Sequence, residues 1–337
     1  MAEATPPYIC SLCHYHNTNR PVLQLAKERG KDAVRWQVES KMDGARLSDF
    51  LRRKGFSAAL LKRVKFSPGG LWVNGEEALA NRRLCAGDEV EVRFPPEAPS
   101  DVPESDLPLS ICFEDDHYLV ADKPAGLVVH PTAGHHGDTL AGAYMALMHR
   151  RGEAAPVFRP LYRLDKNTSG ALLLAKTAYG ASAFPREVQK EYLALAQGLF
   201  AQPEGEIDLP IAREEGSIIR RTDSPKGRPS RTHYRVLAQG GGLALLRVRL
   251  LTGRTHQIRV HLSAAGYPLA GDTLYGGDGS LLPRQALHCA LIGFHHPLTG
   301  RFWRVQAGLP ADFAALCREK LPDLDLKILE KTSVETI

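Results

Sequence analysis

A proline-rich, acidic strip divides the chain and constrains its fold more than any other feature. Five prolines stand between Pro95 and Pro108, among scattered Asp and Glu residues. Proline lacks a backbone N–H donor and interrupts helices and the interiors of sheets, so this composition is typical of a semi-rigid linker. We therefore expect a linker at residues 95–108 between two folded domains, residues 34–94 and 109–321.

The two ends of the chain predict little regular structure. Residues 1–33 form an extension that could be disordered, and residues 322–337 form a polar, loose tail. The extension contains Cys10, Cys13 and His16, whose types and close spacing could hold zinc. No second pair of ligands follows at a suitable distance, so unused thiols are the stronger alternative and we predict no metal site.

The distribution of charge favours a polyanionic partner. Residues 218–261 hold ten Lys and Arg against one acid, and residues 34–94 hold twelve bases against eight acids. Residues 97–116 hold seven acids and no base. Two basic zones are typical of a protein that grips RNA at two places, although solvated surface faces would give the same pattern. Neither zone lies on a long amphipathic helix, so a membrane surface is the weaker alternative.

The rest of the composition predicts a protein of the cytoplasm, which we expect to be a monomer. Six cysteines scattered over 337 residues do not form a disulfide framework. No apolar run approaches the roughly 20 residues that cross a membrane. The N-terminus lacks the basic start and apolar stretch of a secretory signal.

Residues 34–94 predict a small α+β module. Apolar residues at helical spacing indicate helices at 46–54 and 57–64, and the second helix would turn Lys62 and Arg63 outward. Strands are expected at 69–75, ending in an Asn-Gly turn, and at 87–94. The helix pair followed by VNG and AGDEVEV resembles the S-four type of RNA-binding module, first seen in a small-subunit ribosomal protein.

Residues 109–321 predict an α+β domain with a mixed, largely antiparallel sheet. Short apolar strands, mixed with a few helices, do not alternate regularly with them. The strands are expected at 118–121, 127–129, 171–175, 192–196 and 243–250.

Asp165 is the strongest single candidate for chemistry. It lies in a polar loop that ends in Gly170 and leads into the apolar stretch 171–175. A carboxylate at the edge of a rigid core can face a cleft. From the loop alone, however, a turn residue that bonds its own backbone is the more common explanation.

A second stretch predicts a partner for this carboxylate. Residues 252–266 are expected to form a helix that begins at Thr252 and ends at Gly266. Arg259 would share its apolar face with Ile258 and Leu262. A guanidinium buried there needs a carboxylate, which in turn it would keep ionised, unless the side chain extends to water.

These stretches resemble the RluA family of pseudouridine synthases. Five strings occur in the family's order: ADKPAGLVVHPT (121–132), YRLDKNTSG (162–170), KEYLA (190–194), TGRTHQIRVHL (252–262) and LHCALIGFHHP (287–297). The resemblance implies the pseudouridine synthase fold and an isomerase that rejoins uracil to the sugar through C5. It departs at Tyr162, where the family has histidine, which puts in doubt the interaction that this histidine makes.

The resemblance also implies the roles of individual residues. Asp165 would be the catalytic carboxylate, acting on the nucleotide or on a sugar proton, with Arg259 as its partner and Tyr192 against the uracil. The uridine would be flipped out of its helix, and Arg163 would fill the vacated stack. The further residues expected to bind RNA are Arg254, His130, Lys62 and Arg63. No cofactor is implied, and large-subunit ribosomal RNA is the expected substrate, with transfer RNA as the alternative.

Three other functions remain open. The same scaffold could bind RNA without catalysis, and replacement of Asp165 by Asn would distinguish this case. A nucleosidase would need two cooperating acids and release free uracil. A metal hydrolase is suggested only by the pairs His135-His136 and His295-His296, which lack helical spacing and an adjacent Glu, so turn or surface positions are expected.

Overall fold

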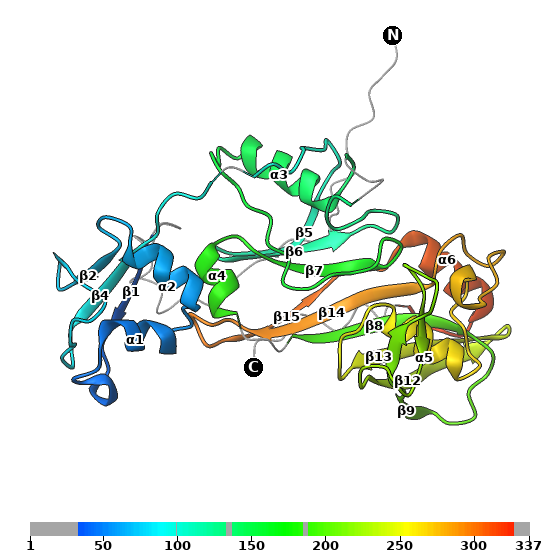
Figure 1. Ribbon diagram of the computed structural model, residues 1–337. Helices are drawn as coiled ribbons and strands as arrows, with labels where there is room; N and C mark the ends of the chain where they lie inside the picture. Colours follow the sequence, from blue (N-terminus) through cyan, green and yellow to red (C-terminus); the bar gives the residue numbers. More distant parts are fainter. Residues whose placement is uncertain (1–32, 99, 133–136, 185–187, 327–337) are drawn as a thin grey trace, which may run out of the picture.

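The computed structural model describes residues 33–98, 100–132, 137–184 and 188–326. Within these ranges the two largest sheets are the centres of two bodies, and Figure 1 shows the smaller body, in blue and cyan, at one end of the larger. Cys10, Cys13, His16 and the pair His135-His136 lie outside the described residues. No helix in the described ranges combines the length and the hydropathy that a bilayer crossing needs.

The smaller body is a four-stranded sheet with two helices, in the strand order β1-β4-β2-β3. Its elements are β1 (Ala33–Gln37), the short 3-10 helix η1 (Ser40–Met42), α1 (Leu47–Arg53), α2 (Ala58–Lys65), β2 (Leu71–Val73), β3 (Glu76–Glu77) and β4 (Glu89–Arg93). The expected Asn-Gly turn joins β2 to β3, with φ of 54° at Asn74 and 79° at Gly75. Two consecutive positive φ angles give the turn that matches the twist of a hairpin.

The larger body is built on a nine-stranded sheet in the order β5-β6-β7-β14-β8-β13-β12-β9, with β15 added on β14. Its strands are β5 (Ser110–Glu114), β6 (Tyr118–Lys123), β7 (Ser169–Ala175), β8 (Gln189–Gln197), β9 (Glu204–Asp208), β12 (Arg231–Gly240), β13 (Leu243–Leu250), β14 (Leu287–His295) and β15 (Phe302–Gln306). Among the strands of the described residues, only β7 and β14 pair in parallel. The predicted α+β class with a mixed, largely antiparallel sheet is therefore confirmed.

Helices and a small hairpin complete the larger body. They are α3 (Leu140–Arg150), α4 (Ala178–Ala183), the hairpin of β10 (Ile211–Arg213) and β11 (Arg221–Asp223), α5 (Gln257–Ala264), the 3-10 helix η2 (Thr273–Tyr275) and α6 (Ala311–Lys320). Figure 1 shows α4 beside the smaller body and α5 at the opposite end of the sheet.

The strand expected at 127–129 is wrong. Leu127 and Val129 are buried, but their backbone groups serve other elements. The carbonyl of Leu127 accepts from the ammonium of Lys123, and those of Val128 and Val129 accept from the first amides of α3. Leu127 and Val129 are therefore buried without forming a strand, because the carbonyls at 127–129 accept hydrogen bonds from the first amides of a helix and from a lysine.

The acidic strip at 95–108 lies against the larger body. Its described residues contain no helix or strand. Ser105 is buried and donates to Asp138 at 3.1 Å, and Val102 and Leu107 pack on the main core. The glutamate Glu97 pairs with Arg63 of α2 and with Arg159, so it bridges the two bodies.

The two bodies also meet through α4. Tyr179 of this helix is 2% exposed and belongs to the core of the smaller body. Its hydroxyl donates to the carbonyl of Lys54 at 2.8 Å, and the hydroxyl of Ser182 donates to that of Gly55 at the same distance. These hydrogen bonds fix the smaller body against the larger sheet.

Candidate active site

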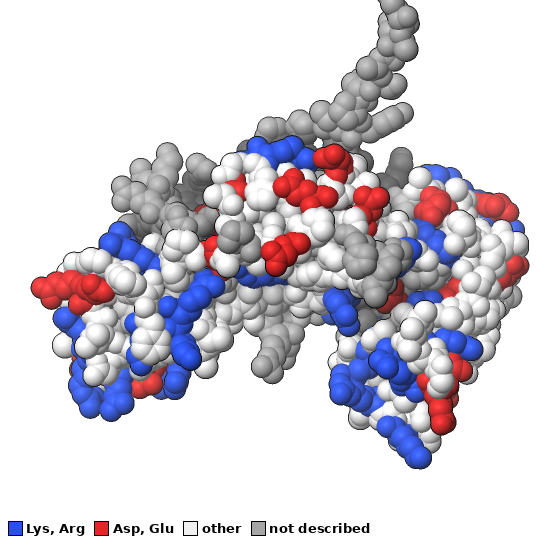
Figure 2. Space-filling view, turned by 45° about the horizontal axis from the view of Figure 1, so that its top comes forward, with Lys and Arg blue, Asp and Glu red and all other residues white. Residues whose placement is uncertain are grey.

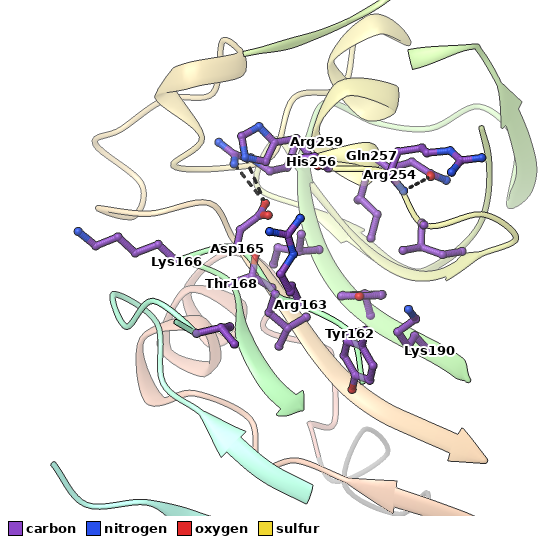
Figure 3. Close-up of a pocket in the computed structure, with 18 of the residues that line it drawn as sticks. Tyr162, Arg163, Asp165, Lys166, Thr168, Lys190, Arg254, His256, Gln257 and Arg259 are labelled. Atoms are coloured by element: carbon purple, nitrogen blue, oxygen red, sulfur yellow. Dashed lines mark hydrogen bonds and ion pairs between the residues drawn. The ribbon is translucent and has the colours of Figure 1, made fainter. Parts of the chain in front are cut away.

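A cavity of about 520 Å³ is lined by the loop before β7, by β8 and by α5. The loop before β7 contributes Asp165, and a turn holds it, since the amide of Thr168 donates to the Asp165 carbonyl at 3.1 Å. The Asp165 side chain is 26% exposed, so a carboxylate oxygen reaches the cavity. Figure 3 shows Asp165 pointing toward His256 and Arg259.

Arg259 holds the Asp165 carboxylate from α5. Its Nη1 lies 3.3 Å from Asp165 Oδ2, while Nε and Nη2 donate to the two oxygens of Asp272 at 2.7 and 2.8 Å. Arg259 is 6% exposed. Burial alone would lower the pKa of Arg259, but the carboxylates of Asp272 and Asp165 outweigh it and raise that pKa. The guanidinium therefore stays charged beside Asp165.

The helix that carries Arg259 is shorter than expected. It begins at Gln257 rather than Thr252, and His256 before it adopts φ 57° and ψ 18°. The hydroxyl of Thr252 donates to the Gln257 side chain, which also accepts from the amide of Arg254. These hydrogen bonds hold residues 252–256 in a loop that sequence spacing cannot reveal. Gly266, with φ 86°, follows the helix at the expected end.

Two residues of the site were missed from the sequence. Asp272 lies beyond the TGRTHQIRVHL string, and only the need of Arg259 for a carboxylate could have pointed to it. His256 lies within the string; its Nε2 is 3.7 Å from Asp165 Oδ2 and its Nδ1 is 2.8 Å from the Tyr275 hydroxyl. Burial lowers the pKa of His256, so its imidazole favours the neutral form.

Lys123 was also missed from the sequence, and it holds the Asp165 loop through a hydrogen bond to the carbonyl of Lys166. It is 0% exposed, and its ammonium donates to the carbonyls of Pro124, Leu127 and Lys166 at 2.8, 2.8 and 2.9 Å. Burial lowers the pKa of Lys123 to about 7, whereas the three acceptors favour the charged form. The residue ties β6 to the loop before β7.

Tyr192, Tyr162 and Lys190 lie on another part of the cavity wall. Tyr192 is 6% exposed, and burial raises its pKa well above the usual range, so the phenol keeps its proton. The Tyr162 hydroxyl donates to the carbonyl of Ala171 at 2.7 Å. The Lys190 ammonium lies over the Tyr162 ring, 4.5 Å from its centroid. The residue in place of the family's histidine is thus anchored to β7.

The residues expected to bind RNA fall in two places. Arg163, Arg254 and His130 line the cavity, and Arg163 is exposed at its mouth. Lys62 and Arg63 are exposed on α2 of the smaller body and do not line the cavity. The structure therefore brings the first three together with Asp165 but not the last two.

The described residues contain no group of three or more His, Cys, Asp or Glu side chains that could hold a metal ion. His296 directly precedes the turn at 297–299 and is buried at 4% exposure, with its Nε2 3.1 Å from Asp115 Oδ2. Its Nδ1 accepts from the amides of Leu298 and Thr299. His295 is exposed and packs on Phe302.

Comparison with known proteins identifies the larger body. The family model for RNA pseudouridylate synthase matches residues 117–264. The chain is 37% identical to the uncharacterized RNA pseudouridine synthase YjbO of Bacillus subtilis over 278 residues, covering 81% of this chain and 98% of that protein. It is 35% identical over 312 residues to ribosomal large subunit pseudouridine synthase D of Xanthomonas campestris, covering 86% and 88%.

A solved structure agrees with these relatives. Human RNA pseudouridylate synthase domain containing 1 aligns with a TM-score of 0.51 at 26% identity, covering 71% of this chain and all of that one. The resemblance to the RluA family seen in the sequence is thereby confirmed. The chain belongs to the RNA pseudouridine synthases, the isomerases that convert uridine in RNA to pseudouridine.

Proposed function

We propose that this pseudouridine synthase modifies uridines of large-subunit ribosomal RNA and that Asp165 is its catalytic carboxylate. The observation that carries the proposal is the hydrogen bond between Asp165 and the buried guanidinium of Arg259 on the wall of a 520 Å³ cavity. A cavity of this size is in the range that holds a small-molecule group such as one nucleotide.

The reaction asks for an ionised carboxylate in a fixed position. Asp165 either attacks the sugar or removes a sugar proton, and both routes need its negative charge. Arg259 supplies the counter-charge, and Asp272 fixes the guanidinium through two parallel hydrogen bonds. The arrangement orients Asp165 before the substrate arrives, which removes part of the entropic barrier.

Base flipping brings the uridine to this carboxylate. A stacked uracil cannot reach a half-buried side chain, so the nucleotide leaves its helix and enters the cavity. Arg163, exposed at the mouth, fills the vacated stack with its planar guanidinium. Tyr192 provides a flat wall for the uracil and, with its pKa raised, stays protonated against it.

The choice of ribosomal RNA rests on two supports. Relatives at 35% to 42% identity carry the name ribosomal large subunit pseudouridine synthase D. Lys and Arg side chains also gather on two lobes that project from one side of the molecule, with a hollow between them (Figure 2). A structured RNA can bridge such lobes through its phosphates. We place this activity in the cytoplasm.

Mapping of pseudouridine tests the proposal. Total RNA from cells that lack the gene is compared with RNA from the same cells carrying the wild-type gene or the Asp165→Asn gene. We expect one or more large-subunit ribosomal positions to lose pseudouridine and only the wild-type gene to restore them. Restoration by Asp165→Asn would refute the catalytic role, and loss confined to transfer RNA would refute the substrate.

A further inference from the structure

Lys190 places a positive charge in the cavity wall without a carboxylate beside it. It is the second residue of β8, half-buried, and lines the same cavity as Asp165. Across the described ranges of the chain, no acidic side chain forms an ion pair with it. Arg259 differs, because two carboxylates neutralise it. Burying a cation without a counter-charge costs free energy unless a ligand provides a hydrogen-bond acceptor for it.

Tyr162 fixes the position of this ammonium. The nitrogen lies 4.5 Å from the centroid of the tyrosine ring, within the range of a cation–π interaction. The Tyr162 hydroxyl reaches the carbonyl of Ala171 in β7, so the ring is anchored to a central strand. Figure 3 shows Tyr162 beside Lys190, with Arg163 drawn between them and Asp165. A histidine at 162 is shorter and has no hydroxyl for this anchor, so the anchored pair depends on the tyrosine.

We propose that Lys190 is a further residue that contacts the substrate: its ammonium donates a hydrogen bond to a carbonyl oxygen of the flipped uracil, with Tyr162 as its positioning residue. The inference rests on the proposed function of Asp165 and extends it to the base. It assigns Lys190 to the uracil and not to the phosphate backbone, because the lysine lies in the cavity wall with Tyr192 and not on the outer surface.

The chemistry of the reaction gives this hydrogen bond a purpose. When the N1–C1′ bond breaks, its electron pair leaves with the uracil and the negative charge spreads over N1, O2 and O4. A hydrogen bond from a fixed cation to O2 or O4 is stronger at that moment than in the bound substrate, so it lowers the barrier. In this step Lys190 donates a hydrogen bond and transfers no proton. C5 then bonds to the sugar, loses its hydrogen, and N1 gains one.

Single-turnover tritium release tests the inference, with ribosomal RNA transcripts labelled at uridine C5. We expect Lys190→Met to lower the rate constant roughly 100-fold. The half-saturating RNA concentration should stay within about threefold of wild type, and Lys190→Arg should recover most of the rate. Tyr162→Phe, which loses only the anchor, should lower the rate less than Lys190→Met. The same change at Lys320 of α6, which does not line the cavity, is the matched control and should have no effect.

A second arm changes the substrate, so that each protein is compared with itself on two RNAs. Sulfur accepts hydrogen bonds weakly, so 2-thiouridine or 4-thiouridine at the modified position should slow the wild-type enzyme and leave Lys190→Met unaffected. Equal rates for wild type and Lys190→Met, or an effect confined to the half-saturating concentration, would overturn the inference. Wild-type protein that releases no tritium would instead refute the proposed function itself.

Discussion

At the scale of single residues, the site depends on Arg259 standing between two carboxylates. Asp272 takes two of its hydrogen bonds and Asp165 receives a third, longer one. The Asp272 side chain is 1% exposed, against 26% for Asp165. The buried aspartate therefore holds the arginine, and the arginine holds the accessible aspartate.

Asp272→Asn tests this order. The amide keeps the shape but loses the charge that fixes Arg259, so we expect the rate of isomerisation to fall by roughly 100-fold. The free energy of unfolding should drop by about 3 kcal/mol, because a buried charge loses its partner. Tritium release and urea unfolding measure the two effects. Asp278→Asn, in the exposed turn that follows, is the control and should change neither; an unaffected rate in Asp272→Asn would contradict the account.

Asp122 makes a prediction about pH. Burial raises the pKa of Asp122 from 3.8 to about 6. Between these values the folded protein binds a proton that the unfolded chain does not, so this group lowers stability as the pH rises through that window. Asp122→Asn should therefore unfold like wild type near pH 4 and be more stable by on the order of 2 kcal/mol above pH 6. Melting curves at both pH values check this, with the exposed Asp116→Asn as control. A stability difference between Asp122→Asn and wild type that is the same at both pH values would contradict the prediction.

At the scale of elements, α4 connects the two bodies. Tyr179 inserts between Trp36, Phe56 and Phe94 of the smaller body, with ring centroids 5.7, 5.1 and 6.0 Å away. Gly55, at φ 94°, would bring a Cβ within 2.8 Å of Ala183. The close approach and the aromatic cluster set the distance from α2 to the cavity.

Tyr179→Ala should loosen this connection. We expect the smaller body's core to be destabilised by about 3 to 5 kcal/mol. We also expect roughly tenfold weaker binding of structured RNA at an unchanged single-turnover rate, because the smaller body, which binds the RNA at a second place, loses its fixed position. Tyr179→Phe keeps the ring and serves as the matched control. Stability and RNA affinity both equal to wild type in Tyr179→Ala would show that the tyrosine does not position the smaller body.

The elements also show what the sequence can predict. The strands at 118–121, 171–175, 192–196 and 243–250 are all present, because each is a continuous apolar run whose burial and backbone pairing coincide. The strand predicted at 127–129 is wrong because Leu127 and Val129 are buried but the backbone here does not pair with a strand. The prediction that the next helix begins at Thr252 is wrong. The side chain of Gln257 donates hydrogen bonds to Thr232 and to the carbonyl of Arg231, and these partners are distant in sequence.

The site shows the same division. Asp165 and Arg259 could be found because both lie in recognisable strings, and the burial of Arg259 demanded a carboxylate. Asp272 lies outside these strings, and the need of Arg259 for a carboxylate does not single it out, since Asp165 also meets that need. The role of Tyr179 in another body's core is equally invisible, because a buried tyrosine on a short helix predicts only local packing.

At the scale of the whole molecule, basic and acidic side chains gather on different parts of one face. In Figure 2 the Lys and Arg side chains gather on both projecting lobes, and acidic side chains gather on the part between and above them. Lys62 and Arg63 lie on α2 of the smaller body, and Arg220 belongs to the basic zone at 218–261. Such a surface binds RNA phosphates and releases counterions.

Charge reversal in either zone should weaken RNA binding and make it less dependent on salt. For Lys62→Glu with Arg63→Glu, and separately for Arg220→Glu, we expect the slope of log affinity against log salt to fall by about 1 for each phosphate that the protein no longer neutralises. Filter binding between low and high salt measures the slopes. Asp101→Asn, on the acidic strip, is the control. If neither charge reversal changes the slope, RNA does not bind through the two basic lobes.

The central claim is that the negative charge at position 165 performs the isomerisation. Tritium release and RNA binding measured on one preparation of Asp165→Asn test it most directly. The account predicts a rate at least roughly a thousandfold below wild type, with RNA affinity largely kept. An Asp165→Asn protein that binds RNA and releases tritium near the wild-type rate would contradict it.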